Sequence, residues 1–194
     1  MKPLPLSAAL ISIDVQQAFD CPSWGRRNNP DAEQKIAALL AAWRATGRPV
    51  FHIQHHSASP AGLFRPGTPG YAHKPEGQPL PGEAVIVKSV NSAFIGTDLE
   101  VRLRAAGIAT LAIVGLTTDH CVSTTARMAG NFGFETYLVA DATATFERTG
   151  PDGRHFTAEQ MHDTALASLH REFATVVWSE ELLASLGLQA RARA

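Results

Sequence analysis

The chain has 194 residues and a formal net charge of -1 at neutral pH. That length suits one domain with a hydrophobic core, so we expect residues 1–194 to form a single domain. Because basic and acidic residues are nearly equal in number, the composition does not indicate binding to nucleic acid or to an anionic membrane surface. Two cysteines are too few for a disulfide framework, and a reducing, cytoplasmic location is expected.

The N-terminal stretch allows two interpretations. Lys2 and the apolar residues up to Ile13 resemble a signal peptide, but Pro3 and Pro5 interrupt the stretch and no small-residue cleavage site follows cleanly. We therefore expect a buried first strand over residues 8–14. No apolar stretch of the sequence is long enough to span a bilayer.

Apolar runs rich in Val and Ile alternate with segments of helical periodicity along the chain. Strands are predicted over 8–14, 50–54, 84–87, 110–115, 135–140 and 175–178. Helices are predicted over 31–46, 98–106, 119–131 and 157–172, with a last short helix after residue 179. This alternation predicts an α/β fold: a three-layer α/β/α sandwich around an open, mainly parallel, Rossmann-like sheet of about six strands.

Residues 57–82 interrupt the alternation. The segment holds six of the twelve prolines and five of the fifteen glycines. A long stretch without secondary structure inside a compact domain is usually functional or disordered. Because it directly follows a predicted strand, we expect one of two roles. It covers the catalytic edge of the sheet, with Phe64, Arg65 and Tyr71 lining a pocket, or it is a surface loop used in subunit contacts.

Three predicted strands each lead to a different reactive residue. Asp14 ends the first strand, Lys88 follows the third, and Cys121 follows the fourth after a short turn. In open parallel sheets, ligands bind beyond the carboxyl ends of the strands. A carboxylate, an ammonium and a thiol are therefore expected at one edge of the sheet, and this set suits covalent catalysis by a cysteine.

Each of these residues has a catalytic and a structural interpretation. Cys121 lies in the first turn of a predicted helix, with Thr118 as its expected N-cap, where the helix dipole lowers the pKa of a thiol. Its alternative role is that of a small buried apolar side chain. Asp14 would carry a proton for the thiol, or else cap a neighbouring loop or helix. Lys88 would favour the thiolate and hold Asp14, or else extend its ammonium into solvent.

The histidines are weaker candidates. Neighbouring residues of a helix point in different directions, so we expect His120 to have a packing or subunit-contact role rather than to serve Cys121. His52, His55 and His56 suggest a metal, but side chains alternate along a strand and no Cys or carboxylate joins them at ligand spacing. We expect structural or loop roles for them and no metal. No GxGxxG sequence follows any strand, and no cofactor is predicted.

The substrate pocket is expected to be shaped by aromatic side chains. Phe19, Trp24 and Phe94 are the candidates for substrate binding, and Trp24 and Phe94 would enclose a flat molecule. The alternative is that these rings belong to the core or to a subunit interface.

Three segments carry a resemblance to a known family. They are residues 13–19 around the aspartate, 88–94 around the lysine and 115–125 around the cysteine. In order and spacing they resemble the isochorismatase-like superfamily of cysteine hydrolases. That superfamily includes nicotinamidases, N-carbamoylsarcosine amidohydrolases and ureidoacrylate hydrolases. The likeness runs from about residue 10 to residue 178.

The resemblance implies a catalytic triad of Asp14, Lys88 and Cys121. It also implies a cis peptide between Leu116 and Thr117, which would aim the backbone N–H of Thr117, with that of Cys121, into an oxyanion hole. A small-molecule substrate and a homodimer or larger homo-oligomer are implied as well.

Two departures from family patterns narrow the activity. Isochorismatases proper cleave a vinyl ether and typically lack the nucleophilic cysteine, so Cys121 favours the amidohydrolases. The Asp-x-His metal cluster of nicotinamidases is missing from residues 54–59, which argues against nicotinamide as the substrate.

We therefore predict a hydrolase that cleaves an amide-type C–N bond of a small molecule through a thioester on Cys121. The alternatives are an isochorismatase-type ether hydrolase and a catalytically silent binding protein on the same fold. A thiol-redox protein that pairs Cys121 with Cys21 is weakened because the sequence has no Cys-x-x-Cys.

Overall fold

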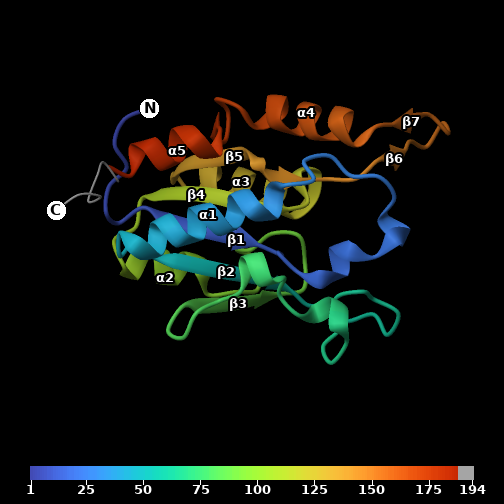
Figure 1. Ribbon diagram of the computed structural model, residues 1–194, viewed down its shortest axis with the longest axis horizontal. Helices are drawn as coiled ribbons and strands as arrows, with labels where there is room; N and C mark the ends of the chain where they lie inside the picture. Colours follow the sequence, from blue (N-terminus) through green and yellow to red (C-terminus); the bar gives the residue numbers. More distant parts are fainter. Residues whose placement is uncertain (188–194) are drawn as a thin grey trace.

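The computed structural model describes residues 1–187, which form a six-stranded sheet between two layers of helices (Figure 1). The strands are β1 (Ala9–Ile13), β2 (Val50–His55), β3 (Ala84–Lys88), β4 (Thr110–Leu116), β5 (Glu135–Ala144) and β8 (Thr175–Val177). Their order is β3-β2-β1-β4-β5-β8, and each neighbouring pair is parallel. The predicted α/β sandwich with an open sheet of six strands is confirmed.

Helices cover both faces of this sheet. On one face lie α1 (Ala32–Ala45) and α5 (Ser179–Ser185), and on the other lie α2 (Leu99–Ala105), α3 (Ser123–Asn131) and α4 (Ala158–Leu169). Side chains alternate between the faces of a strand. Leu10 of β1 therefore packs in the core that contains Ile36 of α1, whereas Ile11 packs in the core that contains Leu103 of α2. Each such fully buried side chain stabilises the fold by roughly 2 kcal/mol.

Local sequence signals set several helix boundaries. Thr157 Oγ1 accepts a hydrogen bond from the Gln160 N–H, and the Gln160 side chain accepts one from the Thr157 N–H, so α4 begins with a capping box. The predicted stop of α1 at Gly47 is present as a left-handed residue with φ 68°. In the described part of the chain, no helix combines the length and apolar character needed to cross a membrane.

The segment before α3 differs from the prediction. Residues Thr118–Val122 form one π-helical turn, and α3 begins only at Ser123. Thr118 does not cap the helix as expected; its hydroxyl forms a hydrogen bond of 2.9 Å with His162 Nδ1 of α4. Turns of this kind are frequent at functional sites, and α-helical periodicity in a sequence does not reveal them.

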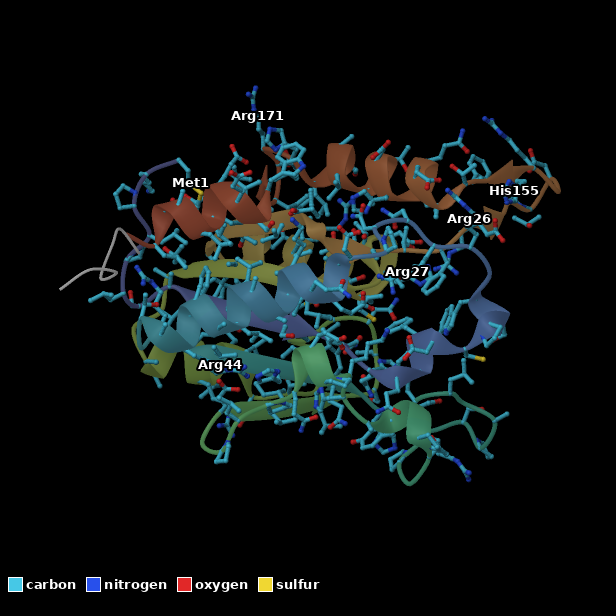
Figure 2. The ribbon with its side chains drawn as sticks, in the orientation of Figure 1. Met1, Arg26, Arg27, Arg44, His155 and Arg171 are labelled. Carbon is cyan, nitrogen blue, oxygen red and sulfur yellow. The ribbon has the colours of Figure 1, made fainter. Side chains whose placement is uncertain are left out.

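The full length of β5 and a small hairpin after it were not predicted. β5 continues to Ala144, with a register shift against β4 between Ile113 and Gly115. A small antiparallel hairpin follows, formed by β6 (Arg148–Thr149) and β7 (His155–Phe156). Figure 2 labels His155 of this hairpin and the neighbouring Arg26. The Glu147 carboxylate bonds to His155 Nε2 and accepts from the Arg26 backbone N–H.

Gly115 marks the closest approach of two strands beside the site. A Cβ at this position would lie 2.0 Å from the Ile13 carbonyl oxygen, and the residue has φ +120°. We expect Gly115→Ala to lower the free energy of unfolding by about 3 kcal/mol or more, because both the contact and the backbone conformation oppose a side chain. Urea unfolding measures the loss.

Gly133 supplies a matched control for that prediction. It also has positive φ, +79°, but a Cβ there would meet nothing within 4 Å. We expect Gly133→Ala to cost only about 1 kcal/mol, from the backbone strain alone. Equal losses in the two variants would contradict the close-approach argument.

Candidate active site

The carboxyl ends of β1 and β3 and the turn after β4 bring Asp14, Lys88 and Cys121 together. Lys88 Nζ donates a hydrogen bond of 2.6 Å to Asp14 Oδ2 and lies 3.3 Å from Cys121 Sγ. All three side chains are buried, with Asp14 only 1% exposed. The expected cis peptide between Leu116 and Thr117 is present. A carboxylate, an ammonium and a thiol therefore share one water-poor site.

The Lys88 ammonium has a third partner that the sequence analysis missed. His55, the last residue of β2, places Nδ1 at 3.1 Å from Lys88 Nζ. An ammonium has three N–H donors and no acceptor, so His55 Nδ1 must accept. The imidazole is then neutral, with its proton on Nε2. Burial, together with the Lys88 charge, lowers the pKa of His55 to about 4.

The backbone of His55 is held by a buried amide side chain. Gln16 Oε1 accepts from the His55 N–H at 2.8 Å, and Gln16 Nε2 donates to the carbonyls of His55 and Tyr71. In the sheet order, β2 lies between β1 and β3. A strand-order prediction would therefore have placed the end of β2, and with it His55, between Asp14 and Lys88.

One group of side chains has the composition of a metal site. Ligand atoms of Asp14, His55 and Cys121 all lie within 4.8 Å of one another. The Lys88 ammonium bonds to all three residues, so a metal ion would have to displace it. The other two histidines of β2 and its extension have different surroundings: His52 bonds to Glu83 at 2.8 Å, and the His56 ring packs near Tyr71.

The pKa of the Cys121 thiol is raised, whereas the sequence analysis expected it to be lowered. Burial and the neighbouring Asp14 carboxylate raise the pKa of Cys121, and Lys88 only partly opposes them. The Lys88 ammonium alone therefore does not lower the pKa of the thiol, because burial outweighs its effect. Burial likewise raises the pKa of Asp14, against the effect of Lys88. Asp14 Oδ1 is buried and has no hydrogen-bond partner within the described residues.

These groups open into a cavity of about 150 Å³. It is lined by Asp14, Phe19, Trp24, His55, Phe64, Asn91, Thr117, His120 and Cys121. Phe19 packs against Trp24 and Phe64, with ring centroids 5.3 and 5.0 Å apart. The cavity thus has an aromatic wall facing its reactive groups. Of the three residues of segment 57–82 that were expected to line a pocket here, Phe64 lines this cavity, whereas Arg65 and Tyr71 do not.

Two expected side-chain positions near the cavity are wrong. Phe94 does not line it; the Phe94 ring packs in the core against Phe132 and Phe134, at 5.3 and 6.1 Å. Phe64, rather than Phe94, joins Trp24 in the aromatic wall. His120 does line the cavity instead of having a packing role, because the α-helical spacing assumed for it does not hold in a π-helical turn.

Asn91 is a second pocket residue that the sequence analysis did not single out. It follows β3 by three residues, and its Oδ1 lies 3.7 Å from Cys121 Sγ. Nothing in its sequence surroundings distinguishes it from a loop asparagine, because its position depends on how the loop after β3 returns across the sheet edge.

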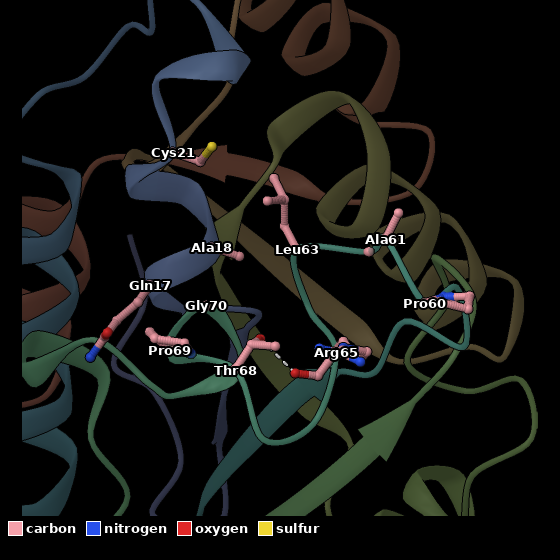
Figure 3. Close-up of a pocket in the computed structure, with 11 residues that line it drawn as sticks. Gln17, Ala18, Cys21, Pro60, Ala61, Leu63, Arg65, Thr68, Pro69 and Gly70 are labelled. Carbon is pink, nitrogen blue, oxygen red and sulfur yellow. Dashed lines mark hydrogen bonds between the residues drawn. The ribbon is translucent and has the colours of Figure 1, made fainter.

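A second, larger hollow of about 430 Å³, called the outer hollow below, is lined by other residues of the same two segments (Figure 3). Ala18 and Leu63 line this outer hollow, while the next residues, Phe19 and Phe64, line the inner cavity. Cys21 opens into the outer hollow, and both cysteines are free thiols. This separation weighs against the redox alternative that pairs Cys21 with Cys121.

Buried ion pairs hold the aromatic wall in place. Lys74, in the segment 57–82, donates to Asp20 Oδ1 at 2.5 Å and to Glu33 Oε1 at 2.8 Å. Arg27 bonds to the same Glu33 carboxylate. Asp20 directly follows Phe19, so this network ties the segment that carries Phe64 to the turn that carries Phe19.

Buried neutral imidazoles predict a folded state that is sensitive to acid. The pKa values of His55 and His73 lie near 4 in the folded protein, against 6.5 for an ordinary histidine. Between these values the unfolded chain binds more protons, so stability falls as the pH falls through that window. Thermal unfolding at about pH 7 and about pH 5 measures the change. We expect His73→Gln to shrink it, and a melting temperature that does not change between the two pH values would contradict the assignment.

Comparisons with known proteins agree with this architecture. Residues 8–181 match the family described as Isochorismatase domain. The isochorismatase family protein YrdC of Bacillus subtilis is 49% identical over 90% of this chain and 94% of its own length. A crystal structure of an isochorismatase-family protein from Chromobacterium violaceum is also 49% identical, with a TM-score of 0.93 over 96% of this chain and 98% of that one. The ureidoacrylate amidohydrolase RutB of Methylobacterium radiotolerans is 30% identical over 98% of this chain and 83% of its own.

Proposed function

This chain belongs to the isochorismatase family of hydrolases, and we propose that it cleaves an amide-type C–N bond of a small molecule through a thioester on Cys121. The observation that carries the proposal is the contact of the Cys121 thiol with the buried Asp14–Lys88 ion pair at the base of an aromatic cavity. The amidohydrolase name of one relative supports the C–N bond as the target.

In the first step, Asp14 takes the proton of the Cys121 thiol as the sulfur attacks the carbonyl carbon of the substrate. The raised pKa of the thiol fits a proton transfer that is coupled to attack rather than completed beforehand. Lys88 stays protonated in this scheme and balances the Asp14 charge. A new C–S bond forms, and the carbonyl electrons move to the oxygen.

The developing oxyanion would be held by the backbone N–H groups of Thr117 and Cys121. Both residues line the cavity, and within residues 1–187 no hydrogen bond is donated by the Thr117 N–H. Preorganised donors of this kind are each worth about 3 kcal/mol of transition-state stabilisation.

Collapse of the tetrahedral species completes acylation. The C–N bond breaks, and Asp14 returns the proton to the leaving amine or ammonia. Asp14 then removes a proton from a water molecule, which attacks the thioester; the carboxylic acid product leaves, and the sulfur regains its proton. The cysteine favours this route over the ether-hydrolase alternative, in which no covalent intermediate forms.

We assign His55 a positioning role in this scheme. Its Nδ1 takes up the Lys88 N–H that neither Asp14 nor Cys121 accepts. The ammonium is therefore held in one orientation between the acid and the thiol. A homodimer or larger homo-oligomer and a reducing, cytoplasmic location, which would keep Cys121 as a thiol, are further parts of the proposal; light scattering and fractionation test them.

The proposal is tested by ammonia release from a panel of small amides, ureido acids and carbamoyl amino acids. We expect at least one of them to be hydrolysed by the natural chain and not by the Cys121→Ala variant. Turnover that is equal in the variant would overturn the covalent mechanism and favour the ether-hydrolase type of chemistry, without a covalent intermediate. A panel with no turnover, in which a compound nevertheless protects Cys121 from alkylation, would support the binding-protein alternative.

A further inference from the structure

We infer that the cavity selects small amides whose remaining part is uncharged and apolar, and that it rejects analogues that carry a carboxylate. The inference rests on the proposed function, because it names the substrate class of the same site. The charged side chains at the cavity, and the hydrogen bonds that these side chains already make, support it.

Among residues 1–187, no guanidinium lines the cavity, and the ammonium of Lys88 beside it is fully engaged. The three N–H donors of Lys88 go to Asp14 Oδ2, His55 Nδ1 and Cys121 Sγ. A substrate carboxylate would have to take one of these donors from a buried partner. Asp14 already neutralises the Lys88 ammonium at 2.6 Å, so the pair offers no net positive charge to a second carboxylate.

The imidazole of His55 offers no positive charge either. Its Nδ1 accepts from Lys88, so His55 carries a single proton, on Nε2, and its pKa of about 4 keeps it neutral at physiological pH. It can donate one neutral hydrogen bond within the cavity, which suits an amide or a carbonyl oxygen better than a carboxylate.

The cations around the cavity are already paired or lie outside it. Arg148 Nε bonds to Asp119 Oδ2 at 3.3 Å. His120, the remaining lining residue able to carry a positive charge, has its Nε2 at 3.6 Å from the same carboxylate oxygen. Arg65 lines the outer hollow (Figure 3). Arg148 is not among the residues that line the cavity, although its Nη2 is buried without a hydrogen-bond partner in the described part of the chain.

The aromatic wall and the small volume of the cavity also disfavour a charged substrate. Phe19, Trp24 and Phe64 form one wall, and these rings have no donor for a carboxylate apart from Trp24 Nε1, which already donates to the Ala18 carbonyl at 2.9 Å. The cavity of about 150 Å³ corresponds to roughly five water molecules. A substrate must therefore be small, and a charged group on it would lie desolvated against carbon.

A pair of alkylating reagents tests the inference directly. Iodoacetamide is a small uncharged amide, and iodoacetate is its anionic counterpart of nearly the same shape. Both transfer the same CH₂ carbon to sulfur with loss of iodide. Cys21 is a half-buried free thiol in the outer hollow and is an internal reference for the intrinsic difference between the reagents.

Mass spectrometry of the natural chain would give the rate of alkylation at each cysteine. We expect the ratio of iodoacetamide to iodoacetate rates to be at least about tenfold larger at Cys121 than at Cys21, because the buried site has no free partner for the anion. In urea-unfolded protein the two ratios should become equal. Ratios that are equal in the folded protein, or a larger iodoacetate rate at Cys121, would overturn the inference.

Turnover gives an independent test. Benzamide and its para-carboxylate have the same scissile bond and differ by one charge. Faster Cys121-dependent hydrolysis of benzamide supports the inference, and hydrolysis that is equal or faster for the carboxylate overturns it while leaving the proposed function intact. Turnover of both that survives Cys121→Ala would overturn the proposed function instead, and the alkylation ratio would still decide the charge preference.

Discussion

Replacing Cys121 by alanine should abolish turnover of any substrate that the panel identifies. The sulfur is the nucleophile that attacks the substrate carbonyl in the proposed mechanism, and no thioester forms without it. Loss of an enzyme's nucleophile typically costs on the order of 10⁴-fold or more in rate. The variant should fold, because a small buried side chain is exchanged for a slightly smaller one at a cost of about 1 kcal/mol.

Steady-state ammonia release, with circular dichroism and thermal unfolding of the same samples, makes this measurement. Cys21→Ala is the matched control, because Cys21 is the other free thiol and opens into the outer hollow. It should keep its activity. A Cys121→Ala enzyme that retains its rate, or a Cys21→Ala enzyme that loses it, would show that the nucleophile has been misassigned.

Replacing Lys88 by methionine should remove both activity and stability. The ammonium and the Asp14 carboxylate form a pair in which neither side chain is more than 1% exposed. Methionine fills a similar volume but leaves the carboxylate buried without a counter-charge. Breaking such a pair by removing one partner costs about 3–5 kcal/mol. Urea unfolding should show this loss, and turnover should fall below detection.

The double variant Asp14→Asn with Lys88→Met separates the loss of stability from the loss of activity. Removing both charges avoids the unpaired buried carboxylate, so much of the stability should return. Activity should not return, because the proton carrier is also gone. A double variant that regains turnover would contradict the role of Asp14, and a Lys88→Met protein as stable as the natural chain would contradict the buried ion pair.

The parts of the site that were predictable are those that lie at strand ends. Asp14, Lys88 and Cys121 each follow an apolar run rich in Val, Ile or Leu, and the carboxyl ends of parallel strands meet at one edge. The runs of β1 and β4 are buried, whereas β3 is an edge strand with Val85 and Val87 exposed. The same logic placed four helices between the strands and a fifth after the last strand, and Gly47 ended the first of them as expected. Burial patterns and turn chemistry act over a few residues, and the sequence shows both directly.

The parts that were missed depend on contacts between distant segments. His55 reaches the site only because β2 lies between β1 and β3 in the sheet. Phe64, rather than Phe94, completes the aromatic wall because the segment 57–82 is fastened through Lys74 to Asp20 and Glu33. A single sequence does not reveal strand order or long-range ion pairs, because neither leaves a local pattern.

Two further predictions, the orientation of His120 and the pKa of Cys121, failed for local reasons. His120 faces the cavity because a π-helical turn replaces the expected α-helical one. The thiol of Cys121 has a raised pKa because its burial, which no motif reports, and the Asp14 carboxylate outweigh the Lys88 charge. Both cases show that residue spacing predicted which groups meet, but not their orientation or protonation.

The central claim is that catalysis passes through a covalent bond to Cys121. The most direct measurement is the mass of the intact protein after rapid acid quench during turnover of an amide from the panel, followed by peptide mapping. We expect a protein species heavier by the acyl group of the substrate. The added mass should map to Cys121 and should be absent from the Cys121→Ala variant. Full turnover with no acyl adduct at any quench time, and with the rate unchanged in Cys121→Ala, would contradict it.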